Sequence, residues 1–162
     1  MRIFTPSTHP GWPGRDTTLV ITVGLPGSGK STAARQWAAA DPDHRIVIAR
    51  DAMRRMIGCM PVGSSAQEAA IQTMMRASVE ALLRGGWDVL VDSTNLQAGL
   101  VRGWRDLAAS RATRMEIMDL THVGPEECIV RNAARVAAGG RDVEPAVIWE
   151  MWHQWMATGQ PT

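Results

Sequence analysis

The stretch Gly24-Leu25-Pro26-Gly27-Ser28-Gly29-Lys30-Ser31 follows the apolar run Leu19-Val20-Ile21-Thr22-Val23 and precedes an alanine-rich stretch that begins at Thr32. This order predicts a buried strand, a glycine-rich loop and a helix. The glycines let the backbone curl tightly with its N–H groups pointing inward, in conformations that only glycine adopts at low cost. The helix adds the positive end of its dipole, so we expect the loop to hold phosphate groups.

Two side chains of this loop carry the expected chemistry. Lys30 is placed to reach the β- and γ-phosphates of ATP or another nucleoside triphosphate, and the hydroxyl of Ser31 to ligate Mg²⁺. The expected nucleotide contacts from this stretch are Gly24, Pro26, Gly27, Ser28, Gly29, Lys30, Ser31 and Thr32. A glycine-rich turn without a ligand is the structural alternative, and the flanking strand and helix argue against it.

Lys30 is also the only lysine among 17 Lys and Arg residues. A general bias toward arginine explains most of this composition. The phosphate loop nevertheless has a lysine at position 30, where a compact ammonium suits phosphate binding better than a planar guanidinium.

The bulk composition limits what the chain can be. A length of 162 residues suits one domain that buries about 70% of its unfolded surface. The net charge of +1 means that affinity for a polyanion must come from a local group of arginines. Cys59 and Cys128 have no metal-ligand spacing and read as buried thiols. No apolar run is long enough for a membrane span and no signal segment appears, so we expect a cytoplasmic protein.

The chain divides into a leader and one domain. Residues 1–16 are rich in proline and glycine and are expected to form a flexible leader, with the domain at 17–162. Apolar runs predict strands at 19–23, 45–49, 87–92 and 114–119, and helical patterns predict a helix from the loop through Ala40 and helices at 51–57, 66–84, 99–110, 125–138 and from 145 to about 155. Two helices have apolar sides that we assign to the core: Ala69, Ile71, Met74, Met75, Val79, Leu82 and Leu83 in the first, and Ile148, Met151, Trp152 and Trp155 in the second.

Strands alternate with helices, which predicts an α/β fold with a parallel sheet of about four strands and helices on both faces. Ligands of such sheets bind at the carboxyl ends of the strands. Polar segments follow three of the predicted strands at these ends: the phosphate loop, Arg50-Asp51, and Asp92-Ser93-Thr94-Asn95.

Two carboxylates at neighbouring strand ends suit a kinase. Asp92 could hold Mg²⁺ through water, and Asp51 could accept a proton from an attacking hydroxyl. The purely structural role of Asp51 would be a helix N-cap. Arg54 lies one helical turn beyond Asp51, where it could bind a second phosphate on the acceptor.

A pair of arginines occurs late in the chain. Arg131 and Arg135 are four residues apart on a helix that ends at Gly139-Gly140, so both project from one side. We interpret this segment as a helical lid that delivers arginines to the transferring phosphoryl group. A solvated helix face is the alternative.

Four segments together resemble the signature segments of the phage-type polynucleotide 5′-hydroxyl kinase domain. They are Gly24 to Thr32, Arg50-Asp51-x-x-Arg54, Ser93-Thr94-Asn95-Leu96 and Arg131-Asn132-x-x-Arg135, in that order. The similarity runs from about Leu19 to Trp155, which is nearly the whole chain.

The resemblance implies transfer of the γ-phosphate of ATP, or another NTP, to the 5′-hydroxyl end of DNA or RNA during nucleic-acid repair, in the host cytoplasm if a phage encodes the chain. Asp51 would be the general base, and Arg54 would bind the phosphate 3′ to the acceptor nucleoside. Lys30 and Ser31 would hold the donor phosphates and Mg²⁺. Family positions then give the remaining residues their roles: Arg131 and Arg135 act from the lid, the latter on the nucleotide, and Thr94 and Asn95 lie near the acceptor.

The chain departs from the phage pattern in three places. Asp92 comes one position earlier than the corresponding acid, and the lid has a longer segment, 136–144, in which Arg141 has no assigned role. A D-x-D-x-T motif is missing, so we expect no 3′-phosphatase activity.

Two other functional classes stay open at this point. A small-molecule kinase or toxin-like sugar kinase uses the same kinds of residue, although Arg54 favours an acceptor with a phosphate. An NTP-dependent binding module is the third class, but a guanine-specific N-K-x-D motif is impossible without a second lysine. The sequence does not decide between DNA and RNA, between duplex and single-stranded ends, among NTP donors, or among oligomeric states.

Overall fold

The structure is a computed structural model that describes residues 16–58 and 63–158. Its elements are β1 (Thr18–Val23), α1 (Lys30–Ala39), β2 (Arg45–Ala49), α2 (Arg50–Gly58), α3 (Ser65–Arg84), β3 (Asp88–Asp92), α4 (Ala98–Ser110), β4 (Arg114–Asp119), α5 (Pro125–Ala137) and α6 (Pro145–Thr158). The predicted elements are all present, with ends that differ by at most three residues. Most of the predicted leader, and Cys59, lie outside the described residues.

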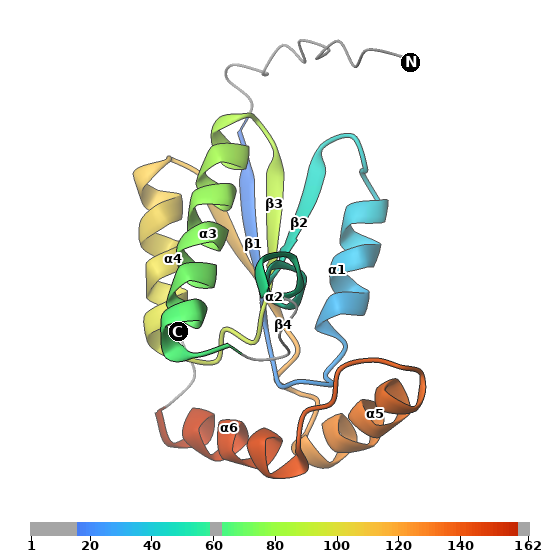
Figure 1. The fold of residues 1–162 in the computed structure, drawn as a ribbon. Helices are drawn as coiled ribbons and strands as arrows, with labels where there is room; N and C mark the ends of the chain where they lie inside the picture. Colours follow the sequence, from blue (N-terminus) through green and yellow to red (C-terminus); the bar gives the residue numbers. More distant parts are fainter. Residues whose placement is uncertain (1–15, 59–62, 159–162) are drawn as a thin grey trace.

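Four parallel strands form the sheet, in the order β2-β3-β1-β4. Helix α1 covers one face, and α3 and α4 cover the other (Figure 1). Helices α5 and α6 lie across the end of the sheet at which the strands terminate (Figure 1). The predicted α/β fold with a parallel sheet and helices on both faces is therefore confirmed.

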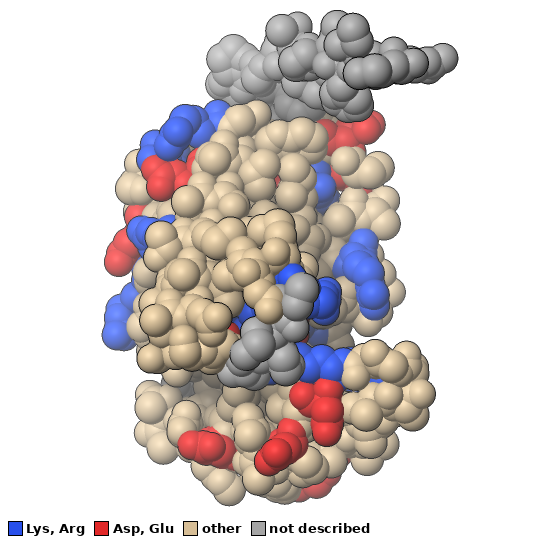
Figure 2. All heavy atoms as spheres, in the orientation of Figure 1, with Lys and Arg blue, Asp and Glu red and all other residues tan. Residues whose placement is uncertain are grey.

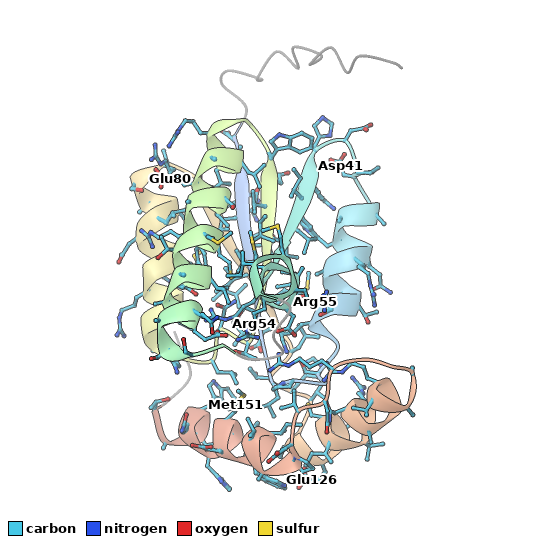
Figure 3. All side chains as sticks on the ribbon, viewed as in Figure 1. Asp41, Arg54, Arg55, Glu80, Glu126 and Met151 are labelled. Atoms are coloured by element: carbon cyan, nitrogen blue, oxygen red, sulfur yellow. The ribbon has the colours of Figure 1, made fainter. Side chains whose placement is uncertain are left out.

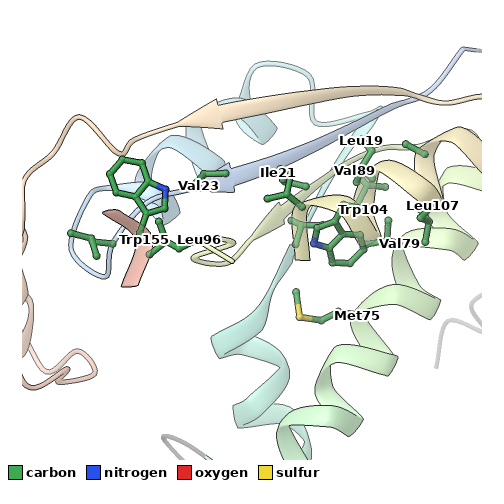
Figure 4. Packing of buried hydrophobic residues seen from close by; sticks show 14 of the residues in the cluster. Leu19, Ile21, Val23, Met75, Val79, Val89, Leu96, Trp104, Leu107 and Trp155 are labelled. Atoms are coloured by element: carbon green, nitrogen blue, oxygen red, sulfur yellow. The ribbon is translucent and has the colours of Figure 1, made fainter. Parts of the chain in front are cut away.

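Alternation along β1 sends side chains to the two faces in turn. Leu19 and Ile21 are fully buried in the larger core, on the side of α3 and α4, whereas Val20 packs toward Ala34 of α1. Trp104 of α4 lies among the strand and α3 side chains of the larger core (Figure 4). Burial of each such large apolar side chain contributes about 1.5–3 kcal/mol, which is an upper estimate because unfolded chains already bury part of this surface.

Helix α3 begins with a capping box. The Ser64 hydroxyl accepts a hydrogen bond from the Gln67 N–H, and the Gln67 side chain accepts one from the Ser64 N–H at 2.8 Å. The buried side of the helix follows a spacing of four residues: Ile71, Met75, Val79 and Leu83. The prediction was wrong for Ala69, which is exposed, because a position two residues before Ile71 lies about 200° around the helix.

The apolar side of α6 packs against the rest of the molecule as predicted. Ile148 and Trp155 are buried, and Met151 and Trp152 are partly buried against the same core. Trp155 lies near Leu96 and Val23 (Figure 4), so α6 is attached to the carboxyl end of the sheet. Cys128 of α5 is also buried, as predicted.

Candidate active site

The sheet order brings the three polar segments together. Strand β3 lies between β1 and β2, so the phosphate loop after β1, Asp92 at the end of β3 and Asp51 after β2 share one edge of the sheet. The Gly24 N–H donates a hydrogen bond of 3.1 Å to the carbonyl oxygen of Thr94, which links the first and third segments directly.

The phosphate loop depends on its glycines. Gly27 and Gly29 have φ angles of +88° and +102°, a region that side chains with a Cβ atom rarely adopt. A Cβ atom on Gly27 would also overlap with the carbonyl oxygen of Cys128, in the first turns of α5. The loop is therefore packed directly against the helix that carries the predicted lid arginines.

Lys30 is the buried cation of this loop. Its side chain is 8% exposed, and its Nζ atom donates hydrogen bonds to the Leu25 carbonyl oxygen at 2.5 Å and to the Ser28 Oγ atom at 3.4 Å. Burial lowers the pKa of Lys30 to about 8, and the negative charges of Asp92 and Asp51 oppose this shift. A phosphate bound in the loop would supply the counter-charge that burial makes necessary.

The predicted metal ligands, Ser31 and Asp92, come from two different elements of the site. Ser31 is exposed in the first turn of α1, and Asp92 is partly exposed at the end of β3. Within residues 16–58 and 63–158, no three His, Cys, Asp or Glu side chains form a metal-binding group. A hydroxyl and one carboxylate nevertheless fit Mg²⁺, which usually takes one or two protein ligands together with phosphates and water.

Asp51 does not have the N-cap position that we predicted as its structural role. Helix α2 begins at Arg50, directly after β2, which places Asp51 in the first turn. Its carboxylate is 45% exposed and accepts two hydrogen bonds at one oxygen, Oδ1, from Arg54 Nη1 at 2.5 Å and Arg141 Nη1 at 2.6 Å.

Glu68 of α3 was not predicted, yet it holds two arginines of the site. Its carboxylate accepts hydrogen bonds of 2.7 Å from both Nε and Nη2 of Arg54, and one of 2.8 Å from Nη2 of Arg50. The hydrogen bonds from Arg54 lower the pKa of Glu68 to about 2. Figure 3 shows Arg54 between α2 and the first turns of α3.

The sequence contains only a weak signal for Glu68. An acidic residue in the first turn of a helix is expected from the helix dipole alone. Only the packing of α2 against α3 brings this carboxylate to Arg50 and Arg54, which are 18 and 14 residues away along the chain.

The two predicted lid arginines reach the phosphate loop from α5. Arg131 donates a hydrogen bond of 3.3 Å to the Ser28 carbonyl oxygen and pairs with Glu127 at 2.5 Å. Arg135 donates a hydrogen bond to the Asn132 side chain. It also lies close enough to Lys30 for its positive charge to lower the pKa of that lysine. Both guanidinium groups therefore lie on the donor side of the site.

The two predicted acceptor-side residues after β3 have different environments. Thr94 is partly exposed. Asn95 is 2% exposed, and its side chain donates to the Thr22 carbonyl oxygen at 2.9 Å and accepts from the Trp104 indole at 3.3 Å. These internal hydrogen bonds give Asn95 a structural role and argue against the predicted contact with substrate.

Charge is distributed unevenly around the site. On the face seen in Figure 2, Lys and Arg atoms gather where the sheet domain meets α5, with acidic side chains below them, and groups of both signs also lie along the left and upper edges. With a net charge of only +1, affinity for a polyanion would have to come from the arginines beside the phosphate loop. None of the described helices is both long and apolar enough to cross a membrane.

A parallel sheet, a phosphate loop with its buried lysine, two carboxylates at adjacent strand ends and arginines from a covering helix define a P-loop kinase domain. The chain belongs to the AAA domain family, which matches it over residues 19–157. No curated protein sequence matches the chain.

Solved structures of similar fold include both nucleic-acid and small-molecule enzymes. A chain of the Pnkp1/Rnl/Hen1 RNA repair complex has a TM-score of 0.78 and 28% identity, and the match covers 89% of this chain and 45% of that chain. A second Pnkp1/Rnl/Hen1 structure has a TM-score of 0.61 and 31% identity, with coverage of 72% and 39%. This chain therefore spans less than half the length of those chains.

The APS kinase CysC of Mycobacterium tuberculosis, solved with AMPPNP and APS, has a TM-score of 0.61 and 20% identity, and the match covers 78% of this chain and 75% of that chain. At this identity the similarity shows the fold alone.

Proposed function

We propose that this domain transfers the γ-phosphate of ATP, or another NTP, to the 5′-hydroxyl end of DNA or RNA. The observation that carries the proposal is the hydrogen-bonded pair Asp51 and Arg54. This pair follows β2 at the same edge of the sheet as the phosphate loop. The similarity to a chain of an RNA repair complex at 28% identity supports a nucleic-acid acceptor, and broken ends would then be the natural substrates.

The donor side would bind the triphosphate through the loop N–H groups, Lys30 and the two α5 arginines. Solved structures with this fold contain AMPPNP or ADP-AlF3, which supports ATP as the donor. Ser31 and Asp92 would hold Mg²⁺, which would neutralise negative charge on the donor phosphates. Arg131 and Arg135 would stabilise the negative charge on the transferring group.

The acceptor side would supply a base and a phosphate contact. In the proposed reaction the 5′-oxygen attacks the γ-phosphorus, the bond to the ADP oxygen breaks, and the hydroxyl proton passes to the Asp51 carboxylate. Arg54 uses three of its five N–H groups on Asp51 and Glu68. The other two have no acceptor among the described residues and would bind the phosphate 3′ to the acceptor nucleoside.

Small-molecule kinases share this fold, as the APS kinase and a gluconokinase from Sinorhizobium meliloti illustrate. The rigidly held guanidinium of Arg54 favours an acceptor that carries a phosphate over a free sugar. A binding module that only hydrolyses its nucleotide has no acceptor phosphate for Arg54 to bind.

Transfer of label from γ-labelled ATP with Mg²⁺ to a 5′-hydroxyl oligonucleotide, as DNA and as RNA, tests the proposal. We expect labelling by the wild type and a fall of about 10²–10⁴ in rate for Asp51→Ala, because a general base contributes that much. Asp43→Ala is the matched control, since Asp43 is an exposed aspartate just before the other end of β2.

Nucleoside 3′-monophosphates and free sugars serve as competing acceptors. If these are labelled while oligonucleotides are not, the acceptor is a small molecule and the proposal is wrong. Hydrolysis of ATP without any labelled acceptor would instead indicate the binding module.

A further inference from the structure

Arg141 connects two parts of the site that are far apart in the sequence. Its Nη1 atom donates a hydrogen bond of 2.6 Å to Oδ1 of Asp51, 90 residues away along the chain. Arg54 donates to the same oxygen, and the other oxygen, Oδ2, has no hydrogen bond to a described residue. We propose that Arg141 is a positioning residue for Asp51: it fixes Oδ1 so that Oδ2 faces the acceptor hydroxyl. This inference rests on the proposed function.

The segment that carries Arg141 is held in place by buried contacts. Asn132 is 3% exposed, and its side chain donates to Asp142 at 3.0 Å and to the Val143 carbonyl oxygen at 2.9 Å. Val143 itself is buried. The two residues that follow Arg141 are therefore held in place by the Asn132 amide and by the buried Val143 side chain.

The turn at the end of α5 directs the chain toward Asp51. Gly139 has a φ angle of +80°, and the Gly140 N–H donates to the Arg135 carbonyl oxygen at 2.9 Å. A Cβ atom on Gly140 would come within 2.5 Å of the Arg135 side chain. The turn that ends α5 thus fixes the direction in which the chain continues to Arg141.

Two donors from different elements restrict the carboxylate in a way that one cannot. Arg54 belongs to the same helix as Asp51, whereas Arg141 approaches from the connection between α5 and α6. With the carboxylate 45% exposed, the second donor prevents a rotation that water would otherwise allow. A partly exposed ion pair contributes only about 0–1 kcal/mol to folding, so removal of Arg141 should affect activity more than stability.

The burial of Arg141 also indicates a fixed position. Its side chain is 26% exposed, and its Nε atom is buried without a hydrogen-bond partner among the described residues. A surface arginine would rotate to hydrate this group, because an unpaired buried donor is unfavourable. The neighbouring contacts therefore hold the guanidinium at Asp51 in spite of this cost.

The test compares Arg141→Gln and Arg141→Lys with the wild type in the oligonucleotide-labelling assay. We expect Arg141→Gln to lower kcat by about 10- to 100-fold, since a small misplacement of a reacting group costs up to about 10², and to change the KM for ATP less than twofold. Lysine should restore part of the rate because it keeps the charge without the planar geometry. Arg102→Gln, at an exposed arginine on α4, is the control for charge removal.

A double variant separates positioning from other roles. If Arg141 acts through Asp51, then Asp51→Ala with Arg141→Gln should be no slower than Asp51→Ala alone. A further fall in the double variant would mean that Arg141 contacts the substrate independently, and a wild-type rate in Arg141→Gln would mean that it has no role; each result overturns the inference. Thermal melting of every variant confirms folding, and a failure of the wild type to label any oligonucleotide overturns the proposed function itself.

Discussion

Glu68 is the residue that most changes the interpretation of the site. Its single carboxylate pairs with both Arg50 and Arg54, and it fixes the guanidinium that would receive an acceptor phosphate. Because bidentate hydrogen bonds from arginine fix direction as well as charge, Glu68 is a positioning residue for Arg54.

We predict that Glu68→Gln lowers the free energy of unfolding by about 1–2 kcal/mol at pH 7, less than the full pKa shift implies because the carboxylate is partly exposed. The pKa of Glu68 is about 2 in the folded protein, against 4.5 ordinarily. A lowered pKa stabilises the fold above pH 4.5 and loses this effect as the pH falls from 4.5 to 2. Urea unfolding of wild type and variant at several pH values measures this difference.

The control is Glu126→Gln, at an exposed glutamate on the outer side of α5 (Figure 3). Glu126→Gln should change the free energy of unfolding only slightly, and by the same amount at each pH. A Glu68→Gln loss that is equal at pH 7 and pH 3 would show that shape, and not charge, is responsible.

At the scale of elements, the phosphate loop and α5 form one packed unit. Gly27 lies against the backbone of Cys128, and Arg131 donates to the Ser28 carbonyl oxygen. Movement of α5 would therefore be transmitted to the loop that holds the donor phosphates, because packed backbone cannot yield independently.

This packing predicts different effects for two glycines with similar backbone angles. Gly29→Ala should cost about 1–2 kcal/mol from its positive φ alone, since nothing lies within 3.7 Å of its new Cβ atom. Gly27→Ala should cost about 2–4 kcal/mol, because the overlap with Cys128 adds to the same strain. Chemical denaturation of both variants gives the comparison, and equal costs would contradict the proposed packing.

At the scale of the whole molecule, one core joins the sheet to the helices that cover the site. The buried set that contains Leu19 and Trp104 also contains Cys128 of α5 and Trp155 of α6. We therefore expect the described domain to unfold in a single transition, as most domains of this size do.

Trp155→Ala tests this connection. We predict a loss of about 3–5 kcal/mol, as for other large buried aromatic side chains, with a single transition retained. Trp155→Phe should cost less, because the indole Nε1 atom has no hydrogen-bond partner in the described part of the chain. Met156→Ala, at a neighbouring side chain that is 59% exposed, should change stability by less than about 0.5 kcal/mol. A separate early transition for Trp155→Ala would mean that α6 folds as an independent unit.

The sequence alone determined the sheet, the phosphate loop and the meeting of polar segments at one edge, because strand periodicity, glycine spacing and parallel topology are local or follow from simple rules. It indicated Arg131 and Arg135 for the same reason, since a spacing of four residues defines one side of a helix. Only the tertiary structure decided that Glu68 holds Arg50 and Arg54, that Arg141 reaches Asp51, and that Asn95 turns inward to Thr22 and Trp104. These contacts join different elements, and spacing along the chain does not specify how helices pack against one another or where a connecting segment returns.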